Sequence, residues 1–503
     1  MKVLVGTLNS KFIHSSPAVA YLSAAAEKRA AELDSKGKKG FKIERAEFTI
    51  NNSDDYIYNE IAAAGYDAVC FACYIWNIEK TLHVCENLKK AFPKMVIVLG
   101  GPEVSYDAEE LLKAKPFVDV VIRGEGEKVL PDFLEALAAK NDKAVKNEAT
   151  NDNIGCRIID GGCVAPEDVP NALNKADDLK ILYYETARGC PYNCSYCMSS
   201  IDKKIRAFPM ERVKKELSKI IDAEPRQVKF LDRTFNWSAE RSEEILSFIM
   251  ENDNGTTNFH FEICAEILTE KLMKLIAGAR KNLFRFEVGI QSTNPKTLEA
   301  VGRSANIDKV LDNTSKLVAA ANCPVHVDLI AGLPYEDMES FKKSFNEVYG
   351  LGADELQLGF LKLLKGTVIR AEADKYGYVF DGKAPYQVIK NDFMGPDDMV
   401  RLKRIEHVLD DFYNKGGFNR GLAAVIASFK TAFDFYDCFA EFYFREGYQR
   451  SSHKKEDNYR ILARFAKEET DCGENIKEAL YNDLTERMNP EAVKRFDKKG
   501  WEI

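Results

Sequence analysis

The chain has 503 residues, of which 45% are hydrophobic and 30% are charged, so it is a globular protein too long for one ordinary core. Its 71 Lys and Arg against 79 Asp and Glu give a net charge of −8, and we expect no nucleic-acid partner. The N-terminal apolar run is too short for a secretion signal, and no segment approaches the ~20 apolar residues of a membrane span. We therefore expect a cytoplasmic protein without a membrane partner.

The first 140 residues repeat a strand-like and a helix-like pattern five times. The strand-like segments are residues 2–6, 41–50, 67–73, 95–101 and 118–124. Several are unbroken Val and Ile runs, which are typical of strands buried on both faces of a parallel sheet. We predict a doubly wound, Rossmann-like α/β domain over residues 1–140. Residues 141–180 are rich in charge, Asn and Gly, with weak apolar pieces near Cys156 and Cys163, and they indicate a linker that could contain a hairpin.

A second block alternates in the same way from residue 181. Its strand-like segments are residues 181–190, 228–232, 259–263, 285–290, 325–330 and 355–361. Six successive βα units predict a partial (βα)6, TIM-like barrel over residues 181–375, with its chemistry at the carboxyl ends of the strands. We expect residues 376–503 to be mainly helical. The aromatic run at 429–444 favours helix core over the lining of a substrate cavity.

Three of the twelve cysteines lie close together, at Cys190, Cys194 and Cys197, directly after the first barrel strand. A structural zinc site needs four ligands, usually in two pairs, whereas the nearest histidine along the chain is His260. Three thiolates on one loop can instead bind three irons of a [4Fe–4S] cluster and leave the fourth iron open to another ligand. A zinc site completed by a distant cysteine is the alternative. Most other cysteines lie in apolar segments and are expected to be core residues.

The segment GCPYNCSYCMSS (189–200) resembles the CxxxCxΦC signature of the radical S-adenosylmethionine (SAM) enzymes, where Φ is aromatic. The resemblance implies that Cys190, Cys194 and Cys197 ligate the cluster and that Tyr196 packs near the adenine of SAM. It also implies that the open iron chelates SAM, and that an electron from a flavodoxin- or ferredoxin-type donor cleaves SAM to a 5′-deoxyadenosyl radical.

By the same resemblance, three residues further along the barrel contact SAM. Gln291 and Arg303 would help to hold its ribose and carboxylate, and Gly332, in AGLP, would lie beside the adenine. An Arg fork suits a carboxylate, although a surface salt bridge explains Arg303 equally well. Other polar residues within or just after the barrel strands should face the open end of the barrel or be paired. They are Asp232, Glu262, Glu266, Glu287 and Asp328.

The first block resembles the cobalamin-binding domain that precedes the radical SAM domain in one large subfamily. The resemblance rests on LGGPEVSYD (99–107) and VIRGEGE (121–127), where glycines at strand ends let the backbone approach a ligand closely. Tight turns alone would also explain such glycines. The cobalamin contacts that the resemblance implies are Gly100, Gly101, Gly124 and Glu125.

Many cobalamin proteins place a histidine on the cobalt with the motif Asp-x-His-x-x-Gly. Neither His14 nor His83 fits that pattern, so we expect no histidine on the cobalt. Tyr74 and Trp76 follow the third strand. They could shield the lower face of cobalamin or, equally, form an aromatic plug between domains.

The order of the three blocks resembles a bacterial subgroup with an uncharacterised C-terminal domain. It implies a cobalamin-dependent radical SAM enzyme, which we expect to be a methyltransferase acting on an unactivated carbon of an unknown small-molecule or peptide substrate. A radical cyclase, oxidase or rearrangement enzyme with the same cofactors, and a non-catalytic cobalamin or redox sensor, are the alternatives. A tRNA methylthiotransferase is disfavoured, because its N-terminal domain would ligate a second cluster, whereas Cys70, Cys73 and Cys85 lie on a strand end and a helix.

Overall fold

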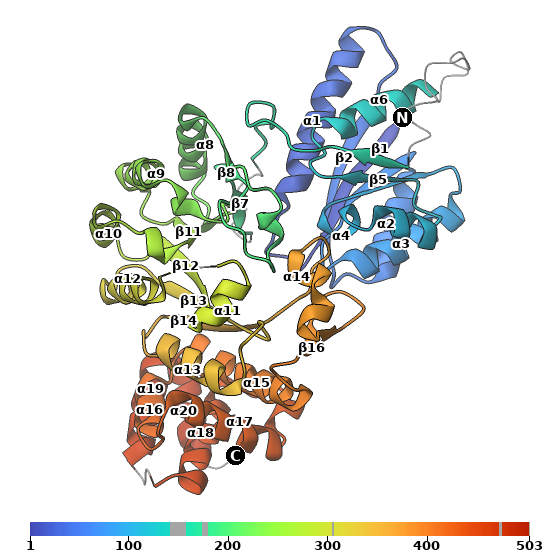
Figure 1. The fold of residues 1–503 in the computed structure, drawn as a ribbon. Coiled ribbons are helices and arrows are strands. Elements are labelled where there is room, and N and C mark those ends of the chain that lie inside the picture. Colours follow the sequence, from blue (N-terminus) through green and yellow to red (C-terminus); the bar gives the residue numbers. More distant parts are fainter. Residues whose placement is uncertain (141–156, 174–179, 304–305, 472–474, 502–503) are drawn as a thin grey trace.

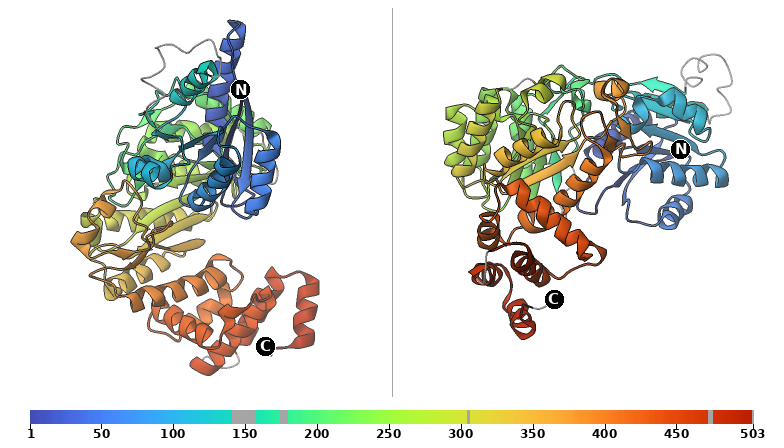
Figure 2. Two further views of the ribbon diagram at one scale, coloured as in Figure 1. Left: turned by 90° about the vertical axis from the view of Figure 1, so that its right-hand side faces the viewer. Right: turned by 60° about the horizontal axis from the view of Figure 1, so that its bottom comes forward.

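The computed structural model describes residues 1–140, 157–173, 180–303, 306–471 and 475–501. Figure 1 shows three parts in chain order: an N-terminal α/β part, a curved sheet with helices along its outer side, and a helical C-terminal part. In Figure 1 and the left view of Figure 2, the C-terminal helices lie at the end of the molecule opposite helix α1 (Pro17–Ser35). None of the described helices combines the length and the apolar composition needed to cross a bilayer.

The N-terminal part is built on one sheet with the strand order β2-β1-β3-β4-β5-β6, in which every neighbouring pair is parallel. The first five strands are β1 (Lys2–Asn9), β2 (Lys42–Thr49), β3 (Ala68–Ala72), β4 (Val96–Gly100) and β5 (Val120–Arg123). The helices after α1 are α2 (Asp54–Ala64), α3 (Ile78–Ala91), α4 (Pro102–Ser105), α5 (Ala108–Ala114) and α6 (Val129–Lys140). One apolar core lies beneath α1 and α6 and another beneath α2, α3 and α5, as predicted for a doubly wound domain.

The sixth strand, β6 (Ile158–Asp160), comes from the segment that we predicted to be a linker. It pairs in parallel with β5, whereas the sequence suggested a hairpin. Ile158 packs against one core of the sheet and Ile159 against the other, which explains why a strand forms here. The described part of the linker thus belongs partly to the N-terminal sheet. The apolar piece at Cys156 lies outside the described residues.

The middle part is a parallel sheet in the order β14-β13-β12-β11-β10-β7. Its strands are β7 (Leu182–Tyr184), β10 (Gln227–Phe230), β11 (Asn258–Ile263), β12 (Phe284–Gln291), β13 (Val325–Ala331) and β14 (Glu355–Phe360). Its main helices are α8 (Met210–Asp222), α9 (Ala239–Glu251), α10 (Glu270–Ala277), α11 (Pro295–Ala300), α12 (Ile307–Ala319) and α13 (Met338–Tyr349). Buried and half-buried residues alternate along β12 and β13, because one face packs on helices and the other lines the interior. Since β7 and β14 are sheet edges, this is the predicted partial barrel.

The C-terminal part begins with an antiparallel pair, β15 (Val379–Phe380) and β16 (Val388–Lys390), and is otherwise mainly helical. Its main helices are α15 (Pro396–Leu409), α16 (Asn419–Ile426), α17 (Ala432–Arg445), α18 (Lys455–Glu469), α19 (Asn475–Arg487) and α20 (Pro490–Lys499). Phe435, Phe439 and Phe442 of α17 are fully buried, and their rings pack on Phe465 of α18. The aromatic run is therefore helix core, as the sequence favoured.

The segment after β14 joins the N-terminal part to the barrel. Nζ of Lys365 donates to the carbonyl of Glu103 at 3.0 Å and pairs with the carboxylate of Asp107 at 2.7 Å. The Tyr386 hydroxyl donates to the carboxylate of Glu103 at 2.7 Å. Glu103 is buried, and this burial raises its pKa. The contacts hold helix α4, at the carboxyl end of β4, against the chain that leaves the barrel.

Candidate functional site

The three motif cysteines lie on the loop that connects β8 (Ala187–Arg188) to β9 (Arg206–Ala207). Backbone hydrogen bonds fix this loop: the N–H of Cys190 donates to Asp202 at 3.1 Å, and the N–H of Ser195 donates to Val301 at 2.8 Å. Cys190 and Cys194 are buried, and Cys197 is half-buried. All three thiols thus belong to one loop that is held by its own ends and by the end of α11.

Arg303 contacts one of these thiols. Its Nη1 lies 3.6 Å from Sγ of Cys194, and its Nη2 donates to the carbonyl of Gly289 on β12. Burial raises the pKa of Cys190, whose Sγ lies 3.7 Å from Oγ1 of Thr234. In the part of the chain that the structure describes, no three His, Cys, Asp or Glu side chains converge as ligands of one metal ion would. The thiolates of a [4Fe–4S] cluster bind different irons and need not converge, so three thiols without an imidazole or carboxylate fit a cluster.

Tyr196, Gln291 and Arg303, which the sequence predicted as SAM contacts, lie on or beside this loop. The Tyr196 hydroxyl and Oε1 of Gln291 are buried and have no hydrogen-bond partner among the described residues. Gln291 has a φ of 73° at an irregularity of β12, a conformation that is uncommon outside glycine. A side chain on Gly289 would overlap the Gln291 amide and lie 3.7 Å from Arg303. Unpartnered buried polar atoms beside an arginine fit a polar ligand such as SAM.

Gly332, the remaining residue predicted to contact SAM, packs against the C-terminal part. At its φ of 89°, a Cβ would lie 2.9 Å from Val388 and 3.0 Å from Met399. Its carbonyl accepts hydrogen bonds from the Tyr378 hydroxyl at 2.9 Å and the Asn391 amide at 3.0 Å. The close approach that this glycine allows is therefore that of β16 and α15.

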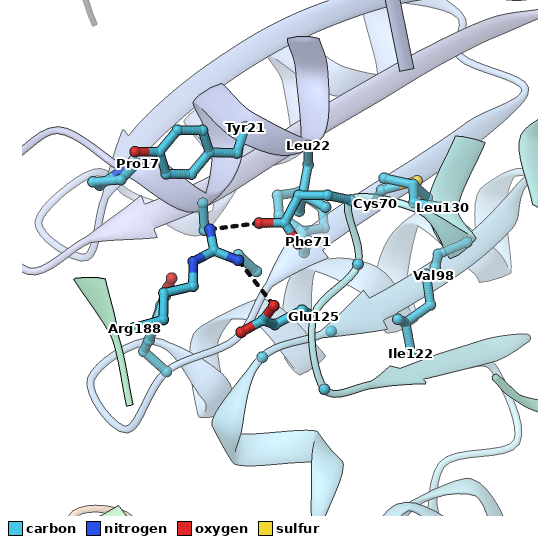
Figure 3. A pocket seen from close by; sticks show the side chains of 18 of the residues that line it. Pro17, Tyr21, Leu22, Cys70, Phe71, Val98, Ile122, Glu125, Leu130 and Arg188 are labelled. Atoms are coloured by element: carbon cyan, nitrogen blue, oxygen red, sulfur yellow. Dashed lines mark hydrogen bonds and ion pairs between the residues drawn. The ribbon is translucent and has the colours of Figure 1, made fainter. Parts of the chain in front are cut away.

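A cavity of about 300 Å³ lies where the carboxyl ends of the N-terminal strands face the barrel. Figure 3 shows side chains of α1, β3, β4 and β5 on its wall, with Arg188 of the barrel opposite them. Leu231, directly after barrel strand β10, also lines the cavity. Predicted cobalamin contacts in the lining are Tyr74, Gly100, Gly101, Gly124 and Glu125. A glycine-rich wall at the carboxyl ends of parallel strands fits a large ligand that approaches the backbone closely.

Trp76 is not among the residues that line the cavity. Its ring stacks on Tyr74 with 4.6 Å between the centroids, and its Nε1 donates to the carbonyl of Leu8 at 3.0 Å. The side chain is 44% exposed. Trp76 therefore supports Tyr74 from the solvent side, and of the two aromatic residues only Tyr74 reaches the cavity.

Backbone geometry alone explains why glycine occupies two of the cavity positions. Gly101 and Gly124 have positive φ, and a Cβ would lie 2.6 Å from the Cys73 carbonyl at the first and 2.7 Å from the Gly162 carbonyl at the second. At Gly100, by contrast, a Cβ would meet nothing closer than a backbone oxygen at 3.5 Å. Gly100 follows the cavity residue Val98 by two positions on β4, so it faces the same space.

Glu125 joins the N-terminal part to both strands that flank the cysteine loop. Its Oε1 pairs with Nη2 of Arg206 at 2.5 Å, and its Oε2 pairs with Nη1 of Arg188 at 3.0 Å, the contact visible in Figure 3. Arg188 also pairs with Glu127 at 2.7 Å and with Glu185 at 2.9 Å. Although burial acts to raise the pKa of Glu125, the hydrogen bond from Arg206 and the charge of Arg188 lower it. Glu125 thus lines the cavity as an ionised partner of two arginines.

Sequence reasoning missed Arg188 and Arg206. Arg188 lies two residues before Cys190 in TARGC. A charged residue between a strand and a ligand motif could have indicated a role at the site. Arg206 offers no local signal, because its role depends on its pairing with Arg188 across β8 and β9.

His14 lies against the edge strand β7 of the barrel and is not among the residues that line the cavity. Its Nδ1 is 2.7 Å from the Tyr183 hydroxyl on β7, and burial lowers its pKa. The N–H of Ile181 donates to the carbonyl of Ile13 at 2.7 Å, which fixes this loop of the N-terminal part on the barrel. His83 is more than half exposed on α3. Neither His14 nor His83 lines the cavity.

The polar residues predicted within the barrel have different environments. Asp232 accepts hydrogen bonds from the N–H of Thr186 at 2.8 Å and from its Oγ1 at 2.5 Å, and burial raises the pKa of Asp232 to about 6. Glu266 accepts a hydrogen bond from the N–H of Asn306 at 3.1 Å. The remaining residues, Glu262, Glu287 and Asp328, occupy half-buried positions on the interior face.

Comparisons with known proteins agree with this geometry. Residues 3–134 match the B12 binding domain, residues 184–348 the radical SAM superfamily, and residues 374–501 a family described as a protein of unknown function (DUF4080). A 2-(S-pantetheinyl)-carbapenam-3-carboxylate methyltransferase of Streptantibioticus cattleyicolor is 25% identical over 65% of this chain and 50% of its own length. The cobalamin-dependent radical SAM methyltransferase TokK of Streptomyces tokunonensis is 25% identical over 58% of this chain and 46% of its own. The chain thus spans about half the length of these relatives.

The fold is shared with the structure of the cobalamin-dependent S-adenosylmethionine radical enzyme OxsB with aqua-cobalamin bound. The TM-score is 0.62, with 13% identity, over 100% of this chain and 84% of that chain. The two N-terminal domains imply a [4Fe–4S] cluster, SAM and cobalamin as cofactors. The chain therefore combines, in this order, segments that match the B12 binding domain, the radical SAM superfamily and DUF4080.

Proposed function

We propose that the protein is an enzyme that transfers a methyl group to an unactivated carbon of its substrate. The observation that carries the proposal is the shared cavity, which is lined by the glycines of the N-terminal part and by Arg188 and Leu231 of the barrel. Arg188 lies two residues from Cys190, so the cavity adjoins the cysteine loop. When bound, the cluster and SAM supply hydrogen abstraction, and cobalamin supplies the methyl group. Both reactions need one site from which water is excluded.

Residues of the chain take separate tasks in this proposal. The cluster is bound by Cys190, Cys194 and Cys197. Arg303, fixed by the carbonyl of Gly289, presents a planar fork that suits the carboxylate of SAM. Tyr196 and Gln291 offer their unpartnered polar atoms to the same molecule. Lys365 donates to the carbonyl of Glu103 and so holds α4, next to the cavity residue Gly101, against the chain that leaves the barrel.

The test is anaerobic reconstitution with iron, sulfide and hydroxocobalamin, followed by incubation with SAM and a strong reductant. We expect both 5′-deoxyadenosine and S-adenosylhomocysteine. The first product alone would favour a cyclase, oxidase or rearrangement enzyme. Neither product, from a protein that retains both cofactors, would favour a sensor. A flavodoxin- or ferredoxin-type protein should replace the chemical reductant.

The environment of the N-terminal cysteines argues against a methylthiotransferase with a second cluster. Cys70, Cys73 and Cys85 are buried, with exposures of 4%, 0% and 0%. Cys73 and Cys85 pack in the core beneath α2, α3 and α5, and Cys70 packs in the core beneath α1 and α6. These thiols support packing as their role.

A further inference from the structure

The segment after β10 brings a hydroxyl group to the cysteine loop. Strand β10 ends at Phe230, and the next residue, Leu231, lines the cavity. Three positions further along the chain, Oγ1 of Thr234 lies 3.7 Å from Sγ of Cys190. Thr234 is buried. A buried hydroxyl thus lies against a sulfur that we assign to the cluster, and the proposed function gives this contact no task.

The usual structural role of a threonine at this position is not taken. Thr234 immediately precedes the short 3₁₀ turn Phe235–Trp237. A threonine at such a place commonly accepts a backbone N–H of the turn with its side-chain oxygen. The Thr234 side chain makes no such hydrogen bond. Capping therefore does not explain why a hydroxyl is buried here.

Hydrogen bonds of neighbouring side chains fix the backbone on both sides of Thr234. Oδ1 of Asn236 accepts the N–H of Cys264 at 2.9 Å, and Nδ2 of Asn236 donates to the Cys264 carbonyl at 2.9 Å. On the other side, the carboxylate of Asp232 accepts the N–H of Thr186 at 2.8 Å. Asn236 and Asp232 are both buried. The segment is thus tied to the end of β11 and to the chain before β8, which sets the position of the Thr234 hydroxyl.

The Thr234 hydroxyl has two neighbours that can accept its proton. It donates to the carbonyl of Arg233 at 2.8 Å, and its oxygen can in turn accept the S–H of a Cys190 thiol. Iron binds the thiolate, so ligation leaves the Cys190 sulfur as an anionic acceptor. Hydrogen bonds to charged groups are about twice as strong as those between neutral groups. A ligated Cys190 therefore attracts the hydroxyl proton, which the carbonyl and the sulfur can share.

Few other groups donate to this sulfur. The backbone N–H of Tyr192 is one donor. In the part of the chain that the structure describes, no side chain other than Thr234 hydrogen-bonds to Sγ of Cys190. Arg303 contacts the sulfur of Cys194 instead, and we assign its planar fork to SAM. A change at Thr234 therefore isolates the effect of one side-chain donor on one cluster ligand.

We propose that the Thr234 hydroxyl raises the reduction potential of the cluster by donating a hydrogen bond to the Cys190 thiolate. Reduction adds one electron from the flavodoxin- or ferredoxin-type donor, and part of its charge falls on the sulfurs. A hydrogen-bond donor at a sulfur stabilises the reduced cluster more than the oxidised one. Thr234 acts through Cys190, so it is a positioning residue. The inference rests on the cluster assignment in the proposed function and does not depend on methyl transfer.

The test is a redox titration followed by EPR, with the full chain reconstituted with cluster and hydroxocobalamin and without SAM. Thr234→Val keeps the shape of the side chain and removes the hydroxyl. We expect its cluster to be reduced about tenfold less favourably, a downward shift of ~59 mV for one electron. Thr234→Ser keeps the hydroxyl and should retain the wild-type potential. The Co(II) signal of cobalamin in the same samples should titrate at an unchanged potential.

Thr257→Val is the matched control. It removes another buried hydroxyl, which donates to the Pro225 carbonyl at 2.8 Å immediately before β11 begins. It should leave the cluster potential unchanged. Iron content reports whether each variant retains its cluster, and Thr234→Ala replaces Thr234→Val if that content falls.

Several results would overturn the inference. They are an unchanged or raised potential in the variant without the hydroxyl, an equal downward shift in Thr257→Val, and a shift in Thr234→Ser as large as that in Thr234→Val. Loss of iron from both Thr234→Val and Thr234→Ala would assign Thr234 to cluster retention and would also overturn it. Absence of a cluster from the reconstituted wild-type protein would instead contradict the proposed function.

Discussion

The thiols of Cys190, Cys194 and Cys197 are the residues on which the cluster assignment depends. Replacing any one of them with Ala should abolish the ~400 nm absorbance of a thiolate-ligated cluster, and SAM cleavage with it. Absorbance of the reconstituted protein measures the first and release of 5′-deoxyadenosine the second. Cys163→Ala is the control, because Cys163 is exposed and lies outside the loop. A triple cysteine variant that kept both signals would show that the assignment is wrong.

Gly100 offers the clearest single-residue probe of the cavity. Gly100→Val should weaken hydroxocobalamin binding about tenfold, or ~1.4 kcal/mol, because the new side chain enters space that the protein leaves open. The melting temperature without cobalamin should change little. Gly101→Leu is the contrasting variant and should lower that temperature, since its Cβ would lie 2.6 Å from the Cys73 carbonyl. Unchanged cobalamin binding by Gly100→Val would contradict the cavity assignment.

Local spacing explains which residues could be predicted from the sequence. The three cysteines occupy one loop, so their positions along the chain largely determine their positions in space. The partners of Gly332 and Glu125 come from distant elements: Val388 lies in the C-terminal part, and Arg206 lies beyond the cysteine loop. The spacing of residues within AGLP or GEGE therefore could not predict these distant partners.

At the scale of elements, the β8–β9 pair connects the cavity to the cysteine loop. Arg188 and Arg206 are cross-strand neighbours at the base of that loop, and both bind Glu125 in the loop after β5. Their side chains are only 12% and 10% exposed. A ligand that orders the loop after β5 should therefore also order the cysteine loop.

Amide hydrogen exchange tests this connection. In the wild-type protein, hydroxocobalamin should slow exchange both at 98–101 and in the cysteine loop, 189–205. In Glu125→Gln, protection should persist at 98–101 and weaken in the cysteine loop, because the charge that holds both arginines is lost. Lys128→Met is the control, since it breaks an exposed pair with Asp168 and should leave both effects unchanged. Equal protection of the cysteine loop in wild type and Glu125→Gln would contradict the connection.

At the scale of elements, some strands could be predicted from the sequence and others could not. Continuous apolar runs, as in β3, β4 and β5, predict strands that are buried on both faces of a sheet. Strand β6 has only three residues and follows a polar segment, and it forms where it can pair with the edge of β5 and pack Ile158 and Ile159 on the two cores. A pairing edge is a property of the folded sheet and has no pattern in the sequence of β6 itself.

At the scale of the whole molecule, the cavity is lined by two parts of the chain. Saturating cobalamin at about 100-fold above its dissociation constant should add ~2.7 kcal/mol to the free energy of unfolding. Because Glu185, Arg188 and Leu231 of the barrel share the lining with the N-terminal strands, the unfolding of both parts should shift upward in calorimetry. A shift confined to the N-terminal part would mean that cobalamin contacts that part alone. Domain composition was predictable from repeated βα patterns, but this shared lining was not, since it arises from docking between the parts.

Strand β6 also determines where a recombinant fragment of the N-terminal part should end. A recombinant fragment that ends at residue 140 would leave the edge of β5 unpaired, and an open edge of that kind invites association between copies. The same fragment would lack Gly162, whose backbone accepts the N–H of Glu125 at 3.0 Å and packs against Gly124. An isolated cobalamin-binding fragment should therefore extend through residue 164, past the point where sequence patterns alone would end it.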